Sequence, residues 1–368
     1  MSENQGEYGR LTPMLAAIEA LVRCESPSED IEACRQVVSL ASDIATRVLG
    51  IPAEIKEIEG RPVFWWGSQN PEVVVLAHLD TVWPHGSYQP LWEVQGDVLR
   101  GPGTFDMKVG FVQAMYALKD IEGALTRVAL IATTDEEIGS HASKALIKEV
   151  SSNAKAVLVL EASLDGKLKT GRKGTSMYQI SVHGLASHAG LEPEKGINAT
   201  TEIANIVLKL STLENAEAGT TVVPTMLRSG NTTNTVPDLA VLDIDARSFS
   251  MDELKRIDSE IKSIQATNPK ARIEVTGGIN RPPLEPASTA SLYARAEKVA
   301  AAMGIAPLGW AEVGGASDGN FAAAAGADVL DGLGAVGGGA HAPSEWVSVS
   351  SIEPRSEFLH HFIKDLLA

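Results

Sequence analysis

Cysteine is scarce in this chain, which has only Cys24 and Cys34 among its 368 residues. Their ten-residue spacing matches neither a redox motif nor a metal-binding cysteine cluster, so we expect two free thiols in a reducing compartment. The sequence also has no apolar run long enough to span a bilayer, and residues 1–7 lack the basic and apolar regions of a signal peptide. These absences predict a cytoplasmic protein that does not bind a membrane.

Positive charge is also in short supply. The chain has 31 Lys and Arg residues against 47 Asp and Glu residues, which gives a formal net charge of −16. Nucleic acids and anionic membranes bind basic faces, so this balance argues against both kinds of partner. A few arginines can still form a local positive pocket, and an acidic small-molecule substrate therefore stays open.

The length of the chain favours two domains. Helix and strand patterns alternate from about residue 10 to 175, which predicts an α/β fold with a mostly parallel sheet and helices on both faces. The pattern then changes to about four strands and two helices, as expected for a small α+β insert with an open sheet. We therefore assign residues 1–174 and 285–368 to one domain and 175–284 to an inserted domain.

The most informative motif follows the apolar run Val73–Leu76, which predicts a buried strand. His78 and Asp80 come at the end of this strand, and residues two apart share one face. A carboxylate beside an imidazole fixes the tautomer and raises the basicity of the ring, as it commonly does for metal-bound histidine. Taken alone, the pair could equally be an ordinary hydrogen bond.

Other strand and helix ends carry similar groups. They are Asp106, which opens a predicted helix; Asp135, Glu136 and Glu137 after a strand; Glu161 after another strand; and His341 in a glycine-rich loop. Singly, Asp106 could be a helix cap and the acidic triplet a solvated turn. Together, two histidines and three carboxylates form a nitrogen and oxygen ligand set suited to zinc, with one carboxylate able to bridge two ions. Glu136 would stay free to act as a base.

These residues are similar to those of the dinuclear-zinc aminoacylase/carboxypeptidase family, which includes glutamate carboxypeptidase, acetylornithine deacetylase and succinyl-diaminopimelate desuccinylase. The resemblance rests on His78-Leu79-Asp80, Gly101-Pro102-Gly103-x-x-Asp106-Met107-Lys108, Asp135-Glu136-Glu137, Glu161 and Gly338-Gly339-Ala340-His341. It covers nearly the whole chain in the same order. It looks closest to glutamate carboxypeptidase, through His78–Pro84, Ser187–Gly190 and Gly314-Gly315-x-Ser317-Asp318. Val109 is a departure, because many members have glycine there.

The resemblance implies a role for each residue of the set. One Zn²⁺ would be held by His78 and Glu161 and the other by Glu137 and His341, with Asp106 bridging them. Asp80 would orient His78, and Glu136 would be the general base. Co²⁺ and Mn²⁺ are candidate substitutes for the two zinc ions.

The resemblance also implies that the inserted domain acts as a lid and dimerisation domain of a homodimer. His188 resembles the histidine that reaches the active site of the partner subunit. Arg247, Arg281, Asn234 and Lys167 resemble residues that grip the carboxylates of the substrate. An arginine on a strand or loop is more commonly a salt-bridging surface group, which is the alternative for the two arginines.

The expected activity is hydrolysis of an amide bond that releases a C-terminal amino acid, glutamate or a similar residue, from an N-acyl amino acid or peptide. An N-deacylase of the acetylornithine deacetylase or succinyl-diaminopimelate desuccinylase type is the alternative. A non-catalytic relative is a third class, but it would be expected to lack the base or a ligand, and none is missing here. Gly332-x-Gly334-x-x-Gly337 matches a dinucleotide-binding pattern, but no helix is predicted after it.

Overall fold

The computed structural model describes residues 9–368, so residues 1–7, where no signal peptide is predicted, lie outside the described part. The chain forms two compact units. The first contains the described residues up to Gly171 together with Glu285–Val313 and Ser317–Ala368, and the second contains Arg172–Leu284 and Gly314–Ala316. The short segment Gly314–Ala316 belongs to the second unit, where Arg247 and Arg172 donate hydrogen bonds to the Gly314 and Gly315 carbonyls.

The first unit is built around a six-stranded sheet with the order β1-β2-β6-β3-β7-β14. Its strands are β1 (Glu54–Ile58), β2 (Arg61–Gly67), β3 (Val73–His78), β6 (Val128–Thr133), β7 (Ala156–Val159) and β14 (Val329–Leu330). The β6-β3-β7-β14 part is parallel, whereas β1 and β2 form a hairpin that joins β6 in antiparallel orientation. The predicted α/β fold with a mostly parallel sheet is therefore confirmed.

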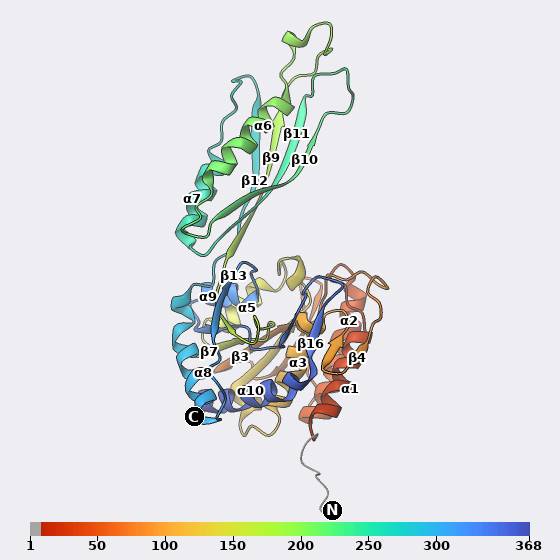
Figure 1. Ribbon diagram of the computed structural model, residues 1–368, viewed down its shortest axis with the longest axis vertical. Helices are drawn as coiled ribbons and strands as arrows, with labels where there is room; N and C mark the ends of the chain where they lie inside the picture. Colours follow the sequence, from red (N-terminus) through yellow and green to blue (C-terminus); the bar gives the residue numbers. More distant parts are fainter. Residues whose placement is uncertain (1–8) are drawn as a thin grey trace, which may run out of the picture. The chain divides into compact units, whose positions relative to one another are not determined.

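Helices cover both faces of this sheet (Figure 1). The helices of the first unit are α1 (Leu11–Arg23), α2 (Ile31–Leu49), α3 (Val109–Leu118), α4 (Ala124–Arg127), α5 (Lys144–Ser151), α8 (Ala290–Ala302), α9 (Asp318–Ala324) and α10 (Ile352–Leu367). Alternate residues of β3 separate the two faces, because Val73 and Val75 join the core formed with α1, α2, α3 and α10 whereas Val74 does not. All six residues of β3 are buried, as expected for a strand covered on both sides.

Two smaller sheets complete the first unit. They comprise β4 (Glu93–Gln95), β5 (Val98–Arg100), β15 (Gly337–Gly338) and β16 (Trp346–Ser348) in one, and β8 (Leu168–Arg172) with β13 (Trp310–Val313) in the other. Pairing of β16 with β5 brings the loop that carries His341 next to the segment before Asp106. No helix among the described residues is long and apolar enough to cross a membrane.

The second unit is a four-stranded antiparallel sheet with two helices on one face (Figure 1). Its elements are β9 (Gly174–His183), α6 (Ala199–Leu210), β10 (Thr221–Ser229), β11 (Leu239–Ser248), α7 (Met251–Lys262) and β12 (Arg272–Arg281), in the strand order β10-β11-β9-β12. Alternate residues such as Ile180 and Val182 of β9 form a core with the two helices. The intervening residues are more exposed, which explains the alternating sequence pattern.

Candidate metal centre

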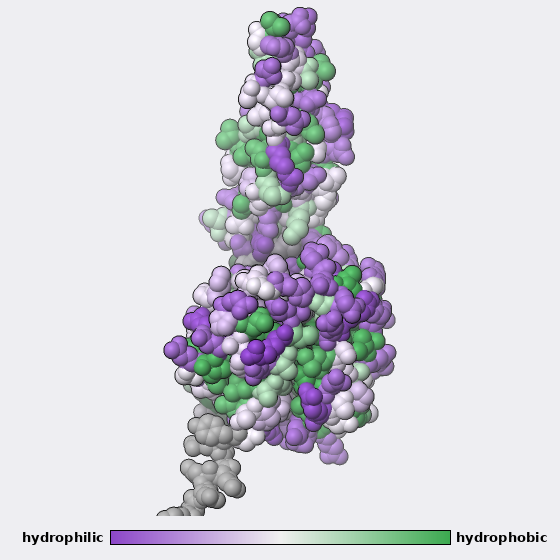
Figure 2. Space-filling view, turned by 90° about the vertical axis from the view of Figure 1, so that its right-hand side faces the viewer, coloured by the Kyte–Doolittle hydropathy of each residue, from purple (hydrophilic) through white to green (hydrophobic). Residues whose placement is uncertain are grey.

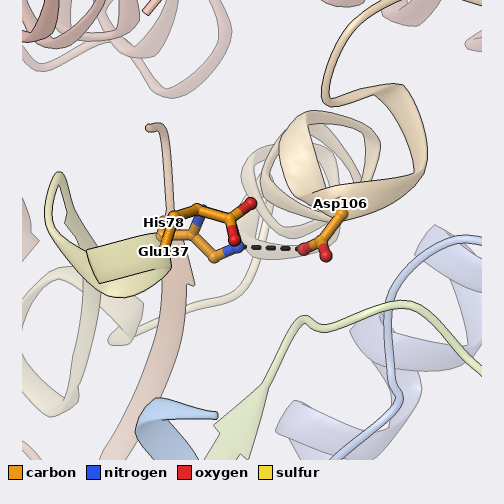
Figure 3. Close-up of side chains that lie close together, drawn as sticks. All are labelled: His78, Asp106 and Glu137. Carbon is orange, nitrogen blue, oxygen red and sulfur yellow. Dashed lines mark hydrogen bonds and ion pairs between the residues drawn. The ribbon is translucent and has the colours of Figure 1, made fainter. Parts of the chain in front are cut away.

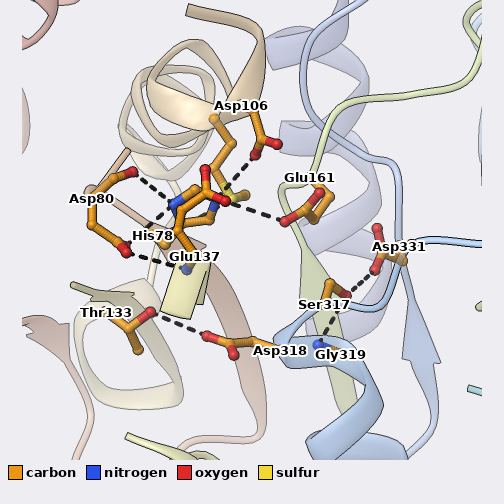
Figure 4. Close-up of polar contacts among 12 residues, drawn as sticks. His78, Asp80, Asp106, Thr133, Glu137, Glu161, Ser317, Asp318, Gly319 and Asp331 are labelled. Atoms are coloured by element: carbon orange, nitrogen blue, oxygen red, sulfur yellow. Dashed lines mark hydrogen bonds and ion pairs between the residues drawn. The ribbon is translucent and has the colours of Figure 1, made fainter. Parts of the chain in front are cut away.

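Three neighbouring parallel strands bring the first group of candidate ligands together (Figure 4). His78 is the last residue of β3, and Glu161 follows β7 by two residues. Glu136 and Glu137 lie in the turn Glu136–Ile138 after β6. Because β6, β3 and β7 are adjacent and parallel, their carboxyl ends meet at one edge of the sheet, where ligands of such folds gather.

Close helix packing supports this edge. The ten residues of α3 are all buried, including Val109, the position that departs from the family pattern. At Gly110 a β-carbon would lie 2.3 Å from the Leu160 carbonyl oxygen, and at Gly334 it would lie 2.1 Å from the same atom. These glycines allow α3 and the segment after β14 to approach the backbone just before Glu161.

Asp106 lies between the two histidines of the set. Its Oδ1 is 3.0 Å from Nε2 of His78, and its Oδ2 is 3.4 Å from Nε2 of His341. Figure 3 shows the first of these contacts, with Glu137 beside it. Each carboxylate oxygen therefore faces a different imidazole, which is the arrangement expected of a bridging ligand.

His341 reaches the cluster from the loop between β15 and β16. Its backbone has a φ of +60°, a left-handed conformation that is uncommon for a non-glycine residue. Its Nε2 lies 2.9 Å from Oε2 of Glu137, and about half of the side chain is exposed. The second pair predicted from the sequence, Glu137 and His341, is thus in direct contact.

Asp80 supports His78 and Glu137 from behind the cluster. Nδ1 of His78 lies 3.0 Å from the Asp80 carbonyl oxygen and 3.4 Å from the carboxylate. The Asp80 carboxylate accepts hydrogen bonds from the Ser28 hydroxyl at 2.7 Å and from the Glu137 N–H at 3.2 Å. With Nδ1 facing an acceptor, Nε2 of His78 is left to face Asp106 and Glu161.

The charges of the cluster perturb one another strongly. The pKa of Glu137 is raised to about 8, mainly by burial and also by the negative charges of Asp106 and Glu136. The hydrogen bond with His341 acts in the opposite direction and lowers this pKa. Hydrogen bonds with Asp106 and Glu137 raise the pKa of His341 to about 10. Burial alone would lower the pKa of His78, but Asp106 and Asp80 outweigh it and raise that pKa well above its usual value. The shifts show that these ionisable groups lie close enough to interact strongly.

The donor atoms fit a metal centre. Candidate ligand atoms of His78, Asp106 and Glu137 lie within 4.8 Å of one another, and so do those of His78, Glu136 and Glu161. His78 is a member of both groups of candidate ligands, and its Nε2 lies 3.7 Å from Glu161. Glu136 therefore lies close enough to His78 and Glu161 to be a metal ligand as well as a general base. The sequence alone does not distinguish these two roles.

Sequence reasoning missed Glu345, a carboxylate that is only 1% exposed. It accepts hydrogen bonds from the backbone N–H groups of Gly103 (3.1 Å), Phe105 (2.8 Å) and Asp106 (3.2 Å), and from Nε1 of Trp83 (3.2 Å). Glu345 thus holds the loop that presents Asp106. No periodicity or charge pattern marks it, because its partners lie about 240 residues earlier in the chain.

The structure also places Lys169 near the cluster, with Nζ 3.9 Å from Glu161. Lys167, the residue predicted to contact substrate, is exposed in the turn before β8. Ser317 and Asp318 begin α9 below the metal centre, where Asp318 accepts a hydrogen bond from Thr133 at 3.1 Å (Figure 4).

The other predicted substrate contacts belong to the second unit. His188 and Asn234 are neighbours there, because the Ala189 N–H donates to the Asn234 carbonyl at 2.9 Å. Arg247 and Arg281 lie on either side of Thr175 in the sheet, so their side chains start from the same row. The Arg247 guanidinium is already paired in two-point fashion with Asp245, at 2.8 and 3.0 Å, whereas Arg281 is 6% exposed.

A parallel-rich α/β sheet with histidines and carboxylates gathered at its carboxyl edge is an arrangement that suits a metal-dependent hydrolase. Residues 74–365 match the model of peptidase family M20/M25/M40, and the chain belongs to this family.

Individual relatives agree with this assignment. The chain is 30% identical to carboxypeptidase G2 of Pseudomonas sp. (strain RS-16), over 85% of this chain and 76% of that protein. It is 25% identical to succinyl-diaminopimelate desuccinylase of Sulfurovum sp. (strain NBC37-1), over 81% and 84% of the two chains. The structure of an M20 family metallo-carboxypeptidase, Sso-CP2 from Sulfolobus solfataricus, superposes with a TM-score of 0.74 at 17% identity and covers 96% of this chain and 99% of its own.

The predicted resemblance and the assignment to the hydrolases are therefore confirmed. The chain is a metal-binding hydrolase of a metallopeptidase family that includes carboxypeptidases and acylase-type enzymes.

Proposed function

We propose that this protein is a cytoplasmic, homodimeric enzyme with two Zn²⁺ ions that hydrolyses the amide bond before a C-terminal glutamate or similar amino acid. The observation that carries the proposal is the position of Asp106, whose two carboxylate oxygens face His78 and His341 separately. A single-ion site would not need a carboxylate placed in this way between two imidazoles.

In this proposal His78 and Glu161 would hold one ion, Glu137 and His341 would hold the other, and Asp106 would serve both. Imidazole nitrogen and carboxylate oxygen suit zinc, and the set contains no thiolate. When bound, a pair of such ions polarises the scissile carbonyl and lowers the pKa of a water molecule. Glu136 would take the proton from the attacking water and pass it to the departing amine.

The second unit offers cationic groups for the free carboxylates of the substrate. Arg281 and Arg247 flank Thr175, and a guanidinium binds a carboxylate through two parallel hydrogen bonds. Arg247 is also paired with Asp245, and both arginines remain proposed carboxylate contacts. Asn234 and Lys167 remain proposed contacts.

His188 is proposed to stabilise the oxyanion that forms at the scissile carbonyl. Its Nδ1 accepts hydrogen bonds from the Gly190 and Leu191 N–H groups, both at 3.1 Å. In the neutral ring the proton is therefore on Nε2, on the exposed side, where it is available as a donor. A donor aimed at a developing oxyanion contributes a large part of catalysis in amide hydrolysis.

The edge strand β10 supports the proposed homodimer. It is the outermost strand of its sheet, and both Met226 (52% exposed) and Leu227 (51% exposed), which point to opposite faces, lie open. Leu208 of the neighbouring α6 is 70% exposed, and Figure 2, which views the β10 side, shows hydrophobic residues among hydrophilic ones. Exposed apolar edge strands are normally paired or protected, so we place the subunit contact here.

A substrate panel on zinc-loaded protein tests the activity. We expect N-acylglutamates and peptides with C-terminal glutamate to be hydrolysed with higher kcat/KM than N-acetylornithine or N-succinyl-diaminopimelate. Preference for either of the latter two would instead favour the N-deacylase alternative, which the similarity to the desuccinylase supports. Zinc-loaded protein that cleaves none of these compounds would contradict the proposal.

Mixing two inactive variants tests whether His188 acts across the dimer. His188→Ala and Glu136→Gln should each lower kcat by at least about 100-fold. Co-expressed, they form mixed dimers in which one site has both a native Glu136 and a native His188 from the other subunit. We expect activity to return to about a quarter of the wild-type value, because half of randomly paired dimers carry one working site.

No recovery in the mixed sample, together with undiminished formation of mixed dimers, would show that His188 does not act on the neighbouring subunit. The zinc content of His188→Ala, measured in parallel, should equal that of the wild type.

A further inference from the structure

The first unit contains a pocket of about 720 Å³ to which no part of the substrate has been assigned. Its walls come from the start of α2, the loop after β3 and the turn after β6, and Glu137 is one of its lining residues. Glu137 also contacts His341 in the metal cluster, so the pocket borders the metal centre at this residue. A group attached to a carbonyl bound at the metal centre could therefore extend into it.

The pocket does not suit the carboxylate of the amino acid that leaves. No lysine or arginine is among the described residues that line it. Arg61 approaches from behind one wall, where its guanidinium donates hydrogen bonds to the Ser28 and Thr134 carbonyls. The free carboxylate was assigned above to arginines of the second unit, so the acyl side of the substrate is left for this pocket.

The rim of the pocket is acidic. Nε2 of His85 lies 3.0 Å from Asp30, and its Nδ1 lies 3.9 Å from Glu25, so one imidazole is shared by two carboxylates. Glu29 is exposed and also lines the pocket. When Glu137 binds a metal ion, Asp30 and Glu29 still give this rim a negative charge. This charge disfavours binding of a substrate whose acyl group carries a carboxylate.

The walls, in contrast, are largely apolar. Pro27, Ile31, Val82, Pro84 and Ile138 line the pocket, and Ile31 and Val82 are 38% and 39% exposed. Pockets of this volume accept ligands of drug size, much larger than an acetyl group. Covering the two exposed side chains removes apolar surface from water, which favours a large apolar group.

We propose that this pocket binds the acyl side of the scissile amide and selects an uncharged, apolar acyl group larger than acetyl over an anionic one. The inference rests on the proposed hydrolase function and narrows its substrate class. It separates this chain from enzymes that remove a succinyl group, whose free carboxylate would meet Asp30 and Glu29.

Two matched substrate pairs test the proposal on the zinc-loaded wild type. N-succinylglutamate and N-succinamoylglutamate have the same size and differ by one negative charge, and we expect at least about tenfold higher kcat/KM for the uncharged one. N-(3-phenylpropanoyl)glutamate should likewise exceed N-acetylglutamate by at least about tenfold. Equal or higher kcat/KM for the succinyl compound would overturn the assignment.

Variants link the preference to this pocket. Asp30→Asn keeps an amide oxygen that can cap α2 and removes the rim charge, so we expect it to narrow the gap between the succinyl and succinamoyl substrates at least about threefold. Glu32→Gln removes the same charge two residues further on, at an exposed position that does not line the pocket, and should leave the gap unchanged.

Ile31→Trp narrows the pocket and should lower kcat/KM for the phenylpropanoyl substrate by a larger factor than kcat/KM for the acetyl substrate. Equal effects of Asp30→Asn and Glu32→Gln would overturn the proposal even if hydrolysis is observed. Failure to hydrolyse any N-acylglutamate would overturn the proposed function itself, which is a separate result.

Discussion

Glu136→Gln is expected to lower kcat by about 1000-fold while the protein keeps its full metal content. A general base contributes about 10² to 10⁴ in rate, and glutamine has the shape of glutamate but cannot take the proton from water. Steady-state kinetics and metal analysis of the same preparation measure both quantities. The protein should fold normally, because Glu136 lies in a short turn at the end of a strand.

The neighbouring substitution Glu137→Gln is the matched comparison. Glu137 contacts His341 at 2.9 Å and is a proposed ligand, so its replacement should reduce metal content as well as kcat. Loss of metal from Glu136→Gln would instead make Glu136 a ligand, as its position within 4.8 Å of His78 and Glu161 allows. A wild-type rate in Glu136→Gln would exclude its role as base.

Asp106→Asn is expected to abolish measurable turnover and to reduce bound metal from two ions per chain to one or none. An amide supplies one weak oxygen ligand where the carboxylate offers an oxygen to each ion, so we expect metal affinity to fall by at least about 100-fold. Competition with a chromophoric chelator measures the affinity, and metal analysis measures the stoichiometry.

The loop should keep its shape in this variant, because Glu345 binds the backbone N–H groups of Phe105 and Asp106 and not the Asp106 side chain. Asp43→Asn, an exposed position on α2, is the control for a lost aspartate charge and should keep both ions. Two tightly bound ions in Asp106→Asn would contradict the bridging assignment.

The sequence predicts the sheet and the meeting of the candidate ligands for a simple reason. Buried parallel strands read as continuous apolar runs; β3 ends at His78, β6 ends at Thr133, and Glu161 follows β7 by two residues. Local signals also mark helix ends, as in α2, where Asp30 caps the first turn and Gly50, with a φ of +78°, follows the last residue Leu49. Because β6, β3 and β7 are adjacent and parallel, their carboxyl ends lie together, independent of the conformation of the connecting segments.

Features that depend on distant contacts were not predicted. The β1–β2 hairpin was not predicted from the sequence. Its place in the sheet depends on the pairing of β2 with β6, which comes much later in the chain. The segment Thr104–Lys108 is irregular, with non-helical backbone at Asp106 and Met107, so α3 begins at Val109 and not at Met107. Glu345 carries no local signal because its partners are far away in sequence. Lys169 lies near Glu161 in the sequence, but no charge or apolar pattern marks their contact.

The loop between β15 and β16 and the strand that follows it have a consequence for how the enzyme is made. Within five residues, this part of the chain supplies both His341 and the carboxylate of Glu345 that fixes the turn around Asp106. A nascent polypeptide that stops short of this segment contains the residues of β3, β6 and β7 but has neither group. Loading of the metal pair should therefore be a late step in biogenesis, and C-terminally truncated products should be inert apoproteins.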